Sequence, residues 1–448
     1  MKKIVLRNGL LINKDKRFYG DLLIENERIK KIGSNIHVDG NYQEINIEGK
    51  ILIPGCIDDQ VHFREPGLTH KASIFSESRA CVAGGITSFM EMPNTVPNTL
   101  TQTLLQEKYD IASSSSLANY SFYMGASNDN YDEVMKTDMQ NVCGVKIFMG
   151  SSTGNMLVDR ADTLEKLFAS VPLLIATHCE DEETIKKNMA LFEAKYGSGI
   201  RPEMHPLIRS EEACFLSSSM AVALARKNNT RLHILHISTE KETHLFDSLL
   251  PLEQKKITAE ACIHHLYFSD EDYKKKGNFI KWNPAVKTKK DQLGILEALT
   301  SNRIDVIATD HAPHTIEEKT KDYLHCPSGG PLVQDALLAM VDVCIKHGLP
   351  LEFLVRKMCH APAQLFRIKD RGFLNEGFFA DLVVLNPSET HTVKKNNLLY
   401  KCGWSPFLNT TFSHSVEATF VNGIQVWDGK KQAIIHETNG KRLQFAYT

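Results

Sequence analysis

The middle of the chain repeats one pattern, in which a short apolar run is followed by a stretch with helical periodicity. This alternation is typical of βαβ units, whose parallel strands are buried on both faces. Eight apolar runs follow the pattern, at residues 51–62, 85–92, 120–124, 144–149, 172–178, 231–237, 256–263 and 305–310. Helices are expected between them, for example at 71–83, 162–169, 211–227, 290–300 and 332–345.

Eight strand and helix steps predict an α/β fold with a (β/α)8 TIM-type barrel. An open doubly wound sheet is the alternative topology. It is disfavoured as a nucleotide-binding fold because none of the strand-to-helix turns carries Gly-x-Gly-x-x-Gly or a Walker lysine loop.

Both ends of the chain carry a different pattern, in which apolar runs are separated by turn residues. Such runs occur at 4–6, 9–12, 21–24, 28–33 and 51–53, and again at 380–385 and 418–427. They predict short antiparallel strands, and segments from the two ends can pair into one small sheet. We therefore expect a β-sandwich domain built from residues 1–53 and 367–448, with the barrel at 54–366 between its two parts.

Composition and charge narrow the class of ligand. The 448 residues include 52 Lys and Arg against 54 Asp and Glu, a net charge of −2, which provides no basic field for nucleic acid or an anionic membrane surface. The N-terminus does not resemble a signal peptide and no window resembles a membrane span, so a cytoplasmic location is expected. The ten cysteines form no Cys-x-x-Cys pair and are expected to be buried and free.

Reactive side chains occur where the apolar runs end. The active site of such a barrel forms at the carboxyl ends of its strands. These ends carry Gln60 with His62, then Asn94, His178, His236, and Asp310 with His314. On a regular strand Gln60 and His62 share a face from which Asp59 points away.

The residue types at the strand ends suit a zinc site. Imidazole and carboxylate bind Zn²⁺, which lowers the pKa of bound water from about 15.7 to about 7. Lys146 lies inside an apolar strand, where a charged ammonium must be paired, extended to the surface or chemically altered. A lone histidine is more often a core residue, which is our interpretation of His233, His264 and His265. Three histidines, an aspartate and a buried lysine at matching ends instead predict a hydrolase.

Over nearly its whole length the chain resembles the long-type dihydroorotases of the cyclic amidohydrolase superfamily. The motifs that carry the resemblance are Phe63-Arg64-Glu65-Pro66-Gly67, Met92-Pro93-Asn94-Thr95, Thr177-His178-Cys179-Glu180-Asp181, Leu235-His236-Ile237-Ser238-Thr239, Asn283-Pro284-Ala285 and Thr309-Asp310-His311-Ala312-Pro313-His314. The resemblance implies zinc-dependent, reversible hydrolysis of L-dihydroorotate to N-carbamoyl-L-aspartate in pyrimidine biosynthesis. It also implies a small anionic substrate, one or two Zn²⁺ ions per subunit and a homo-oligomer, either a dimer or a tetramer.

The resemblance assigns roles to particular residues. Metal ligands would be His62, Lys146, His178, His236 and Asp310. Lys146 would be carboxylated to a carbamate that bridges two metals, with Asp159 as a weaker candidate for the bridge. Asp310 would also transfer the proton. The substrate would be held by Arg64, Asn94, Asn283 and His314.

Two departures from the family keep alternatives open. Gln60 stands where the family has His, and its neutral amide oxygen is a poorer zinc ligand than imidazole. The loop at 322–331 does not repeat the usual substrate-covering sequence. One alternative is a hydantoinase, dihydropyrimidinase or allantoinase, which would lack the Arg64 carboxylate clamp. Another is a metal-poor, inactive homologue that acts as a scaffold for a carbamoyltransferase partner, which Gln60 favours and the retained ligands disfavour.

Overall fold

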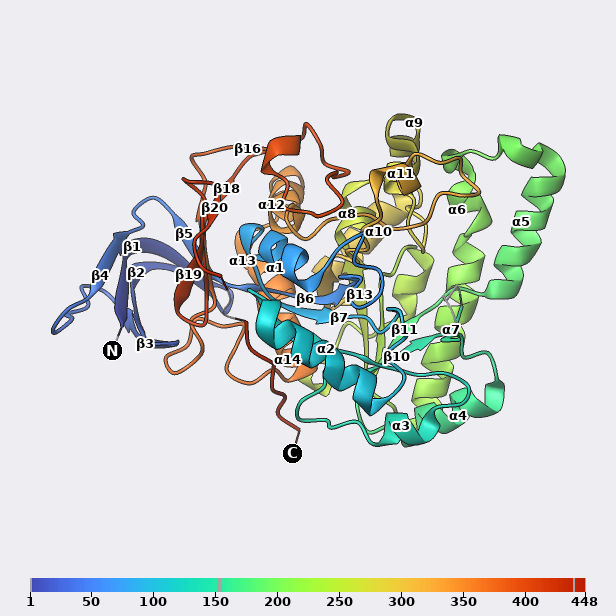
Figure 1. Ribbon diagram of the computed structural model, residues 1–448, viewed down its shortest axis with the longest axis horizontal. Coiled ribbons are helices and arrows are strands. Elements are labelled where there is room, and N and C mark those ends of the chain that lie inside the picture. Colours follow the sequence, from blue (N-terminus) through green and yellow to red (C-terminus); the bar gives the residue numbers. More distant parts are fainter. Residues whose placement is uncertain (1, 151–154, 438–439, 448) are drawn as a thin grey trace.

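A barrel of parallel strands surrounded by helices forms the centre of the molecule (Figure 1). The computed structural model describes residues 2–150, 155–437 and 440–447. The barrel strands are β6 (Cys56–Val61), β7 (Ile86–Glu91), β8 (Asn119–Phe122) with β9 (Met124–Gly125), β10 (Val145–Phe148), β11 (Ile175–His178), β12 (Leu232–Ile234), β13 (Ile257–Cys262) and β14 (Val306–Ala308). A bridge between Val61 and His311, just beyond β14, closes the ring. The predicted barrel is confirmed.

Helices cover the outside of the strands, as the periodicity predicts. They are α1 (Ile74–Ala83), α2 (Gln102–Ser115), α3 (Tyr131–Met135), α4 (Ala161–Ser170), α5 (Glu182–Tyr196), α6 (His205–Ile208), α7 (Glu211–Asn228), α8 (Ile263–Tyr267), α9 (Tyr273–Lys276), α10 (Lys289–Thr300), α11 (Ile316–Lys319), α12 (Ala336–Lys346), α13 (Leu351–Val355) and α14 (Ala361–Phe366). α1 begins later than expected because the Ser73 hydroxyl accepts the Ser76 N–H and so caps the helix there.

Strands from the two chain ends form one mixed sheet beside the barrel (Figure 1). Its members are β1 (Lys3–Asn13), β2 (Lys16–Glu25), β3 (Arg28–Gly33), β4 (Gln43–Asn46), β5 (Ile51–Pro54), β15 (Leu382–Asn386), β18 (Ser415–Val421), β19 (Ile424–Asp428) and β20 (Ala433–Ile434). The antiparallel pair of β5 and β15 joins the N-terminal and C-terminal parts. A separate small pair consists of β16 (His391–Thr392) and β17 (Thr411–Phe412). The domain boundaries at 53/54 and 366/367 stay a prediction.

The run at 51–62, expected as one strand, is two strands in different sheets. β5 belongs to the chain-end sheet and β6 to the barrel, with Gly55 between them. A Cβ atom at Gly55 would lie 2.0 Å from Oγ1 of Thr87, so only glycine lets the chain pass so close to the neighbouring strand.

β6 is irregular as it approaches the barrel mouth. Its register against β7 shifts between Asp58 and Val61. As a result Asp59 and Gln60 both face inward, Asp59 toward His233 of β12 and Gln60 toward Asp310 after β14. The strict alternation predicted from the sequence is wrong for this strand, because a bulge places consecutive residues on the same side.

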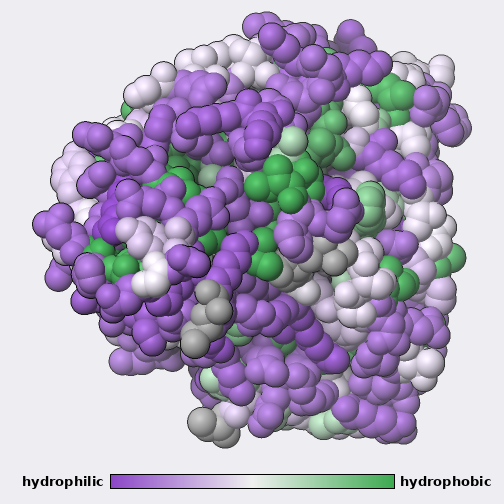
Figure 2. Space-filling view, turned by 60° about the vertical axis from the view of Figure 1, so that its left-hand side comes forward, coloured by the Kyte–Doolittle hydropathy of each residue, from purple (hydrophilic) through white to green (hydrophobic). Residues whose placement is uncertain are grey.

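The surface and the cysteines agree with the composition. Polar residues cover most of the face shown in Figure 2, and the apolar residues there lie in separate groups, which is ordinary for a protein surface. No helix in the described part of the chain combines the length and apolarity of a membrane span. All ten cysteines are buried and free, as predicted.

Candidate active site

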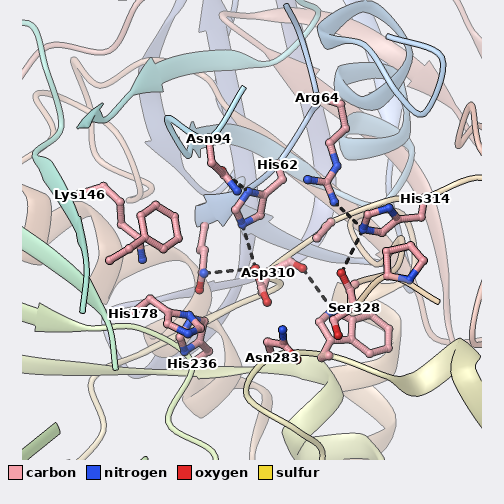
Figure 3. A pocket seen from close by; sticks show the side chains of 16 residues that line it. His62, Arg64, Asn94, Lys146, His178, His236, Asn283, Asp310, His314 and Ser328 are labelled. Carbon is pink, nitrogen blue, oxygen red and sulfur yellow. Dashed lines mark hydrogen bonds and ion pairs between the residues drawn. The ribbon is translucent and has the colours of Figure 1, made fainter. Parts of the chain in front are cut away.

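The ten predicted site residues line one cavity of about 260 Å³ at the carboxyl ends of the barrel strands (Figure 3). They are Gln60, His62, Arg64, Asn94, Lys146, His178, His236, Asn283, Asp310 and His314. The remaining lining residues, to which the sequence assigned no role, are Phe148, Trp282, Ala312 and, from the loop at 322–331, Pro327, Ser328 and Gly329. Residues separated by up to about half the chain therefore meet because parallel strands bring their ends to the same rim.

Two histidines of the cavity present their ring nitrogens to one point. Nδ1 of His178 lies 3.0 Å from Nε2 of His236. The other nitrogen of His178, Nε2, lies 3.0 Å from Oε2 of Glu180 and donates to it, because a carboxylate can only accept. Arg209 binds the same carboxylate oxygen. Glu180 thus fixes the tautomer of His178 and leaves Nδ1 as a lone pair that faces His236.

Electrostatics keeps this part of the cavity ready for a cation. Burial lowers the pKa values of both His178 and His236, which keeps the rings neutral. Burial opposes ionisation of Glu180, yet the Arg209 guanidinium and His178 lower its pKa to about 2. In a typical zinc or transition-metal site, neutral imidazoles bind the ion and an ionised carboxylate hydrogen-bonds to one of them. His178, His236 and Glu180 have this arrangement.

Lys146 reaches the cavity as a buried amine without a hydrogen bond. Among the described residues, Nζ finds no hydrogen-bond partner and lies 4.6 Å from the centre of the Phe148 ring. Burial lowers the pKa of Lys146 to about 7. A neutral amine is the form that reacts with CO₂, so the site fits the predicted carbamate chemically.

On the opposite side of the cavity Asp310 lies between His62 and Gln60. Nδ1 of His62 lies 2.8 Å from the amide oxygen of Asn94 and donates to it, so Nε2 carries a lone pair 3.1 Å from Oδ1 of Asp310. The amide of Gln60 donates to the same Asp310 oxygen at 3.2 Å. Burial raises the pKa of Asp310 to about 7. Gln60 therefore offers Asp310 a donor, where an imidazole would offer a ligand.

A buried arginine forms the third part of the cavity. Nε of Arg64 donates to the carbonyl of Pro313 at 3.0 Å, and Nη2 lies 3.1 Å from Nε2 of His314. Arg64 is 8% exposed, and no carboxylate of the described residues forms an ion pair with it. Burial lowers its pKa to about 10, so it stays charged at neutral pH. A buried cation without a counter-ion is the signature of an anion-binding position.

His314 connects this arginine to the loop that covers the cavity. Its Nδ1 lies 3.0 Å from Nζ of Lys71, and its Nε2 lies 3.0 Å from the carbonyl oxygen of Ser328 and 3.1 Å from Nη2 of Arg64. Two buried lysines hold the loop from beneath, since Lys281 donates to the carbonyls at 323 and 326 and Lys319 to the carbonyl at 327. Although residues 322–331 depart from the family's sequence, lysine side chains hold the backbone of this loop in place.

Three cavity residues adopt the left-handed backbone region. The φ angles are 69° for Arg64, 40° for His236 and 49° for Asp310. Residues with a Cβ avoid this region because of steric strain, and it persists where surrounding structure holds it. The strain marks the same three positions that carry the clamp, a predicted ligand and the predicted proton carrier.

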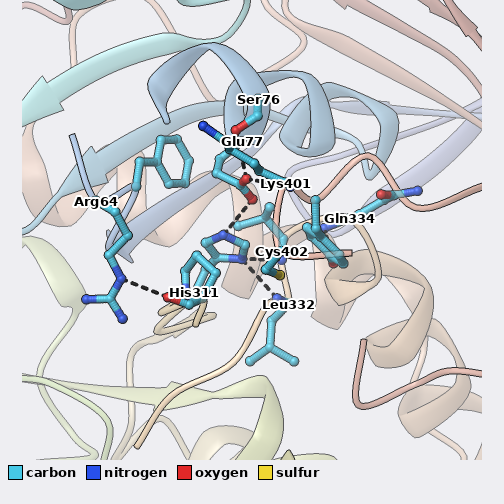
Figure 4. A network of polar contacts seen from close by, with 12 residues as sticks. Arg64, Ser76, Glu77, His311, Leu332, Gln334, Lys401 and Cys402 are labelled. Atoms are coloured by element: carbon cyan, nitrogen blue, oxygen red, sulfur yellow. Dashed lines mark hydrogen bonds and ion pairs between the residues drawn. The ribbon is translucent and has the colours of Figure 1, made fainter. Parts of the chain in front are cut away.

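A polar network behind the cavity, which the sequence did not predict, holds the segment after β14 (Figure 4). Nε2 of the buried His311 lies 2.9 Å from Oε2 of Glu77 in α1. Nδ1 of His311 accepts the N–H groups of Leu332 and Val333. Its carbonyl accepts the N–H of His62. His311 is therefore a positioning residue that ties His62 to the segment carrying Asp310.

Other histidine and aspartate predictions have mixed outcomes. His264 and His265 are buried core residues, as predicted; Nε2 of His265 lies 3.1 Å from the carbonyl of Pro284, whereas the His264 ring stacks on Trp282 and its nitrogens find no hydrogen-bond partner among the described residues. His233 was also expected to be an ordinary core histidine, but it lies beside two carboxylates, Asp59 and Glu260, and these three residues could hold a metal ion. Asp159 is exposed, binds Asn128 and does not line the cavity.

Comparisons with known proteins agree with this architecture. The model of the amidohydrolase family matches residues 51–426. A dihydroorotase of Halobacterium salinarum is 30% identical over 429 residues, which cover 95% of this chain and 96% of the relative. An allantoinase of Bacillus velezensis is 29% identical, covering 96% and 95%. The solved structure of an L-hydantoinase (dihydropyrimidinase) from Arthrobacter aurescens has a TM-score of 0.93 at 24% identity, covering 99% of this chain and 100% of that chain.

Proposed function

Because the chain belongs to the amidohydrolase family and is therefore a cyclic amide hydrolase, we propose that its reaction is that of a dihydroorotase. The enzyme interconverts L-dihydroorotate and N-carbamoyl-L-aspartate. Relatives that are named dihydroorotase support the proposal, but relatives named for other cyclic amides are similarly close. The choice of substrate therefore rests on the site of this chain.

The observation that carries the proposal is the unpaired Arg64 guanidinium. Its Nη1 finds no hydrogen-bond partner among the described residues, while Nε and Nη2 are held by Pro313 and His314. A planar guanidinium fixed on one edge offers its free donors to a carboxylate. L-Dihydroorotate carries a ring carboxylate, whereas the hydantoin and dihydropyrimidine rings need no such counter-charge.

The residues present fit a divalent metal on both sides of the cavity. His178 and His236 would hold one ion with carboxylated Lys146, and His62 with Asp310 would hold a second, while Gln60 is at most a neutral ligand. Zinc bound there would polarise the ring amide carbonyl and make water a nucleophile at neutral pH. The carbamate and the identity of the metal stay predictions.

The chain's own residues supply binding and proton transfer. Arg64 and His314 would hold the ring carboxylate with Asn94, and Asn283 has an amide oxygen with no hydrogen-bond partner among the described residues, available for a ring N–H. Asp310, with its pKa raised to about 7, accepts a proton at Oδ and returns it to the leaving nitrogen during hydrolysis. Pro327, Ser328 and Gly329 of the loop at 322–331 line the cavity beside these residues.

The proposal extends to partners. The chain forms a homo-oligomer, either a dimer or a tetramer. An inactive scaffold for a carbamoyltransferase is disfavoured, because the ligand atoms and their outer partners are in place despite Gln60.

The test compares Arg64→Lys with the wild type on two substrates. Lysine keeps the charge and loses the fork, so we expect kcat/KM for L-dihydroorotate to fall about 10- to 100-fold, the ~1.5–3 kcal/mol of one charge-assisted hydrogen bond. Zinc content should be unchanged. Any turnover of dihydrouracil, which lacks the carboxylate, should not fall.

Arg231→Lys is the matched control. This arginine is partly buried at another part of the barrel, where it binds Tyr447 and the carbonyl of Leu365, so its replacement should leave both substrates unaffected. Wild type that hydrolyses allantoin or hydantoin but not L-dihydroorotate would overturn the proposal. If Arg64→Lys and the wild type have equal kinetics, Arg64 does not bind the substrate carboxylate.

A further inference from the structure

A second group of potential metal ligands lies inside the barrel, apart from the residues that line the cavity. Asp59 on β6, His233 on β12 and Glu260 on β13 are each 0% exposed. Nε2 of His233 lies 3.1 Å from Oδ2 of Asp59 and 3.8 Å from Oε2 of Glu260. One nitrogen and two carboxylate oxygens thus lie within 4.8 Å of one another. We call these three residues the inner triad.

The tautomer of His233 is fixed by its neighbour. Thr258 Oγ1 donates to the carbonyl of Leu232 at 3.1 Å, so the same hydroxyl must accept from Nδ1 of His233, 2.9 Å away. Nδ1 therefore carries the proton of the neutral ring. In the neutral ring Nε2 presents a lone pair to two carboxylates, an arrangement that needs a cation between them, either a proton on Nε2 or a metal ion.

The two carboxylates are oriented as ligands are. Oε1 of Glu260 accepts the N–H of His236 at 2.9 Å and lies 3.1 Å from Sγ of Cys262, whereas Oε2 finds no hydrogen bond among the described residues. Both side-chain oxygens of Asp59 also lack a hydrogen-bond partner there. A buried carboxylate with no donor is unfavourable, and here these oxygens converge on the lone pair of His233.

The total charge of the inner triad distinguishes a proton from a divalent metal ion as the bound cation. A proton on Nε2 leaves one positive and two negative groups, a net charge of −1 buried in the barrel. A divalent ion with a neutral imidazole and two carboxylates is neutral overall. An uncompensated charge buried in the protein is destabilising, so a divalent ion fits these three side chains better than a proton does.

We propose that the inner triad binds a divalent first-row transition metal, of which zinc is the probe, as a structural ion. Imidazole with carboxylates suits these metals. Thr258 behind His233 and the His236 N–H behind Glu260 provide the outer partners that such ligands usually have. This inference does not depend on the proposed dihydroorotase reaction.

The ion would also influence the cavity from beneath. Glu260 joins the triad to the backbone of His236, the residue with φ of 40°. A metal that fixes Glu260 therefore helps to hold His236 in its strained conformation. Asp59 lies next to Gln60, so the irregular β6 brings one residue to each site.

The test is diffraction from crystals of the full chain, stripped with chelator and reloaded with Zn²⁺ alone, with data above and below the zinc absorption edge. We expect an anomalous peak between Asp59, His233 and Glu260 in addition to the peak near His178. Zinc at the cavity with no peak at the triad would overturn the proposal. This measurement needs no variant and no activity.

Zinc counts of variants give a second measurement. Asp59→Asn removes a ligand that has no hydrogen bonds to lose, so it should bind one equivalent less than wild type at the same free zinc. Asp335→Asn, another buried aspartate bound to Ser405 and Tyr400, should bind as many as wild type. His178→Ala should lose cavity zinc and keep the triad peak. Equal counts in Asp59→Asn and wild type would show that a proton on His233 suffices.

Discussion

The two sides of the cavity differ in how completely they are prepared for a metal. On the His178 side, two nitrogens lie 3.0 Å apart, and Glu180 with Arg209 fixes the orientation of one ring. On the Gln60 side, Asp310 accepts a hydrogen bond from an amide, and only His62 offers it a companion ligand. On the His178 side a ring nitrogen with a free lone pair faces a second imidazole, whereas on the Gln60 side an amide already donates a hydrogen bond to the Asp310 carboxylate.

Gln60 in place of the family's histidine therefore changes a hydrogen bond to Asp310 as well as a potential metal ligand. An imidazole at this position would turn a lone pair toward the metal beside Asp310. The Gln60 amide instead stabilises the ionised carboxylate directly. We therefore expect unequal occupancy, with a tightly held ion at Lys146, His178 and His236 and a weaker one beside Gln60.

The largest expected effect comes from Asp310→Asn, which removes the proton carrier of the Gln60 side. Positioned acid-base groups contribute about 10²- to 10⁴-fold, so kcat for L-dihydroorotate should fall by that range. Zinc at the His178 side should remain. Circular dichroism checks the fold, because Asp310 is buried.

Asp305→Asn is the control for Asp310→Asn, since Asp305 is a buried aspartate before β14 that pairs with Lys255. Its variant should keep the wild-type kcat even if it is less stable. Activity of Asp310→Asn near that of wild type would move the proton carrier elsewhere, with His314 the next candidate.

The next effect is on the prepared side. Glu180→Gln keeps the shape but removes the charge that orients His178 and pairs with Arg209. Loss of such an outer partner weakens metal binding about 10- to 100-fold. Calorimetric zinc titration should show this loss in the tighter of two binding steps. Weakening confined to the looser step would reverse our assignment of the two sides.

Gln60→His should have the smallest effect, but it tests the difference between the two sides of the cavity most directly. An imidazole beside Asp310 should tighten the weaker zinc step at least about tenfold, or ~1.4 kcal/mol, and leave the tighter step unchanged. Gln60→Asn is the control, because it keeps an amide and should not tighten either step. Two equally tight equivalents in the wild type would show that the amide is no disadvantage.

The sequence predicted the position of most cavity residues because they follow apolar runs, whereas Lys146 lies inside such a run and Asn283 was assigned by the family resemblance alone. His62, His178, His236 and Asp310 follow strands, and the barrel geometry makes all such ends meet. It missed Glu180 as a partner of His178, although the two are only two residues apart, because the Arg209 that completes this pairing follows a separate helix, α6. It misread Asp59 and His233 because the bulge in β6 reverses the expected face.

The amino-acid sequence was enough to predict the order of strands and helices, the sheet shared by the two chain ends and the reactive residues that follow the strands. These follow from local periodicity and from a rule that every parallel barrel obeys. The folded arrangement was needed to show that Arg64 lacks a counter-ion, that Gln60 donates to Asp310 and that three buried side chains converge inside the barrel. Hydrogen-bond direction and charge compensation depend on atoms from distant parts of the chain. Local periodicity in the sequence does not predict these long-range contacts.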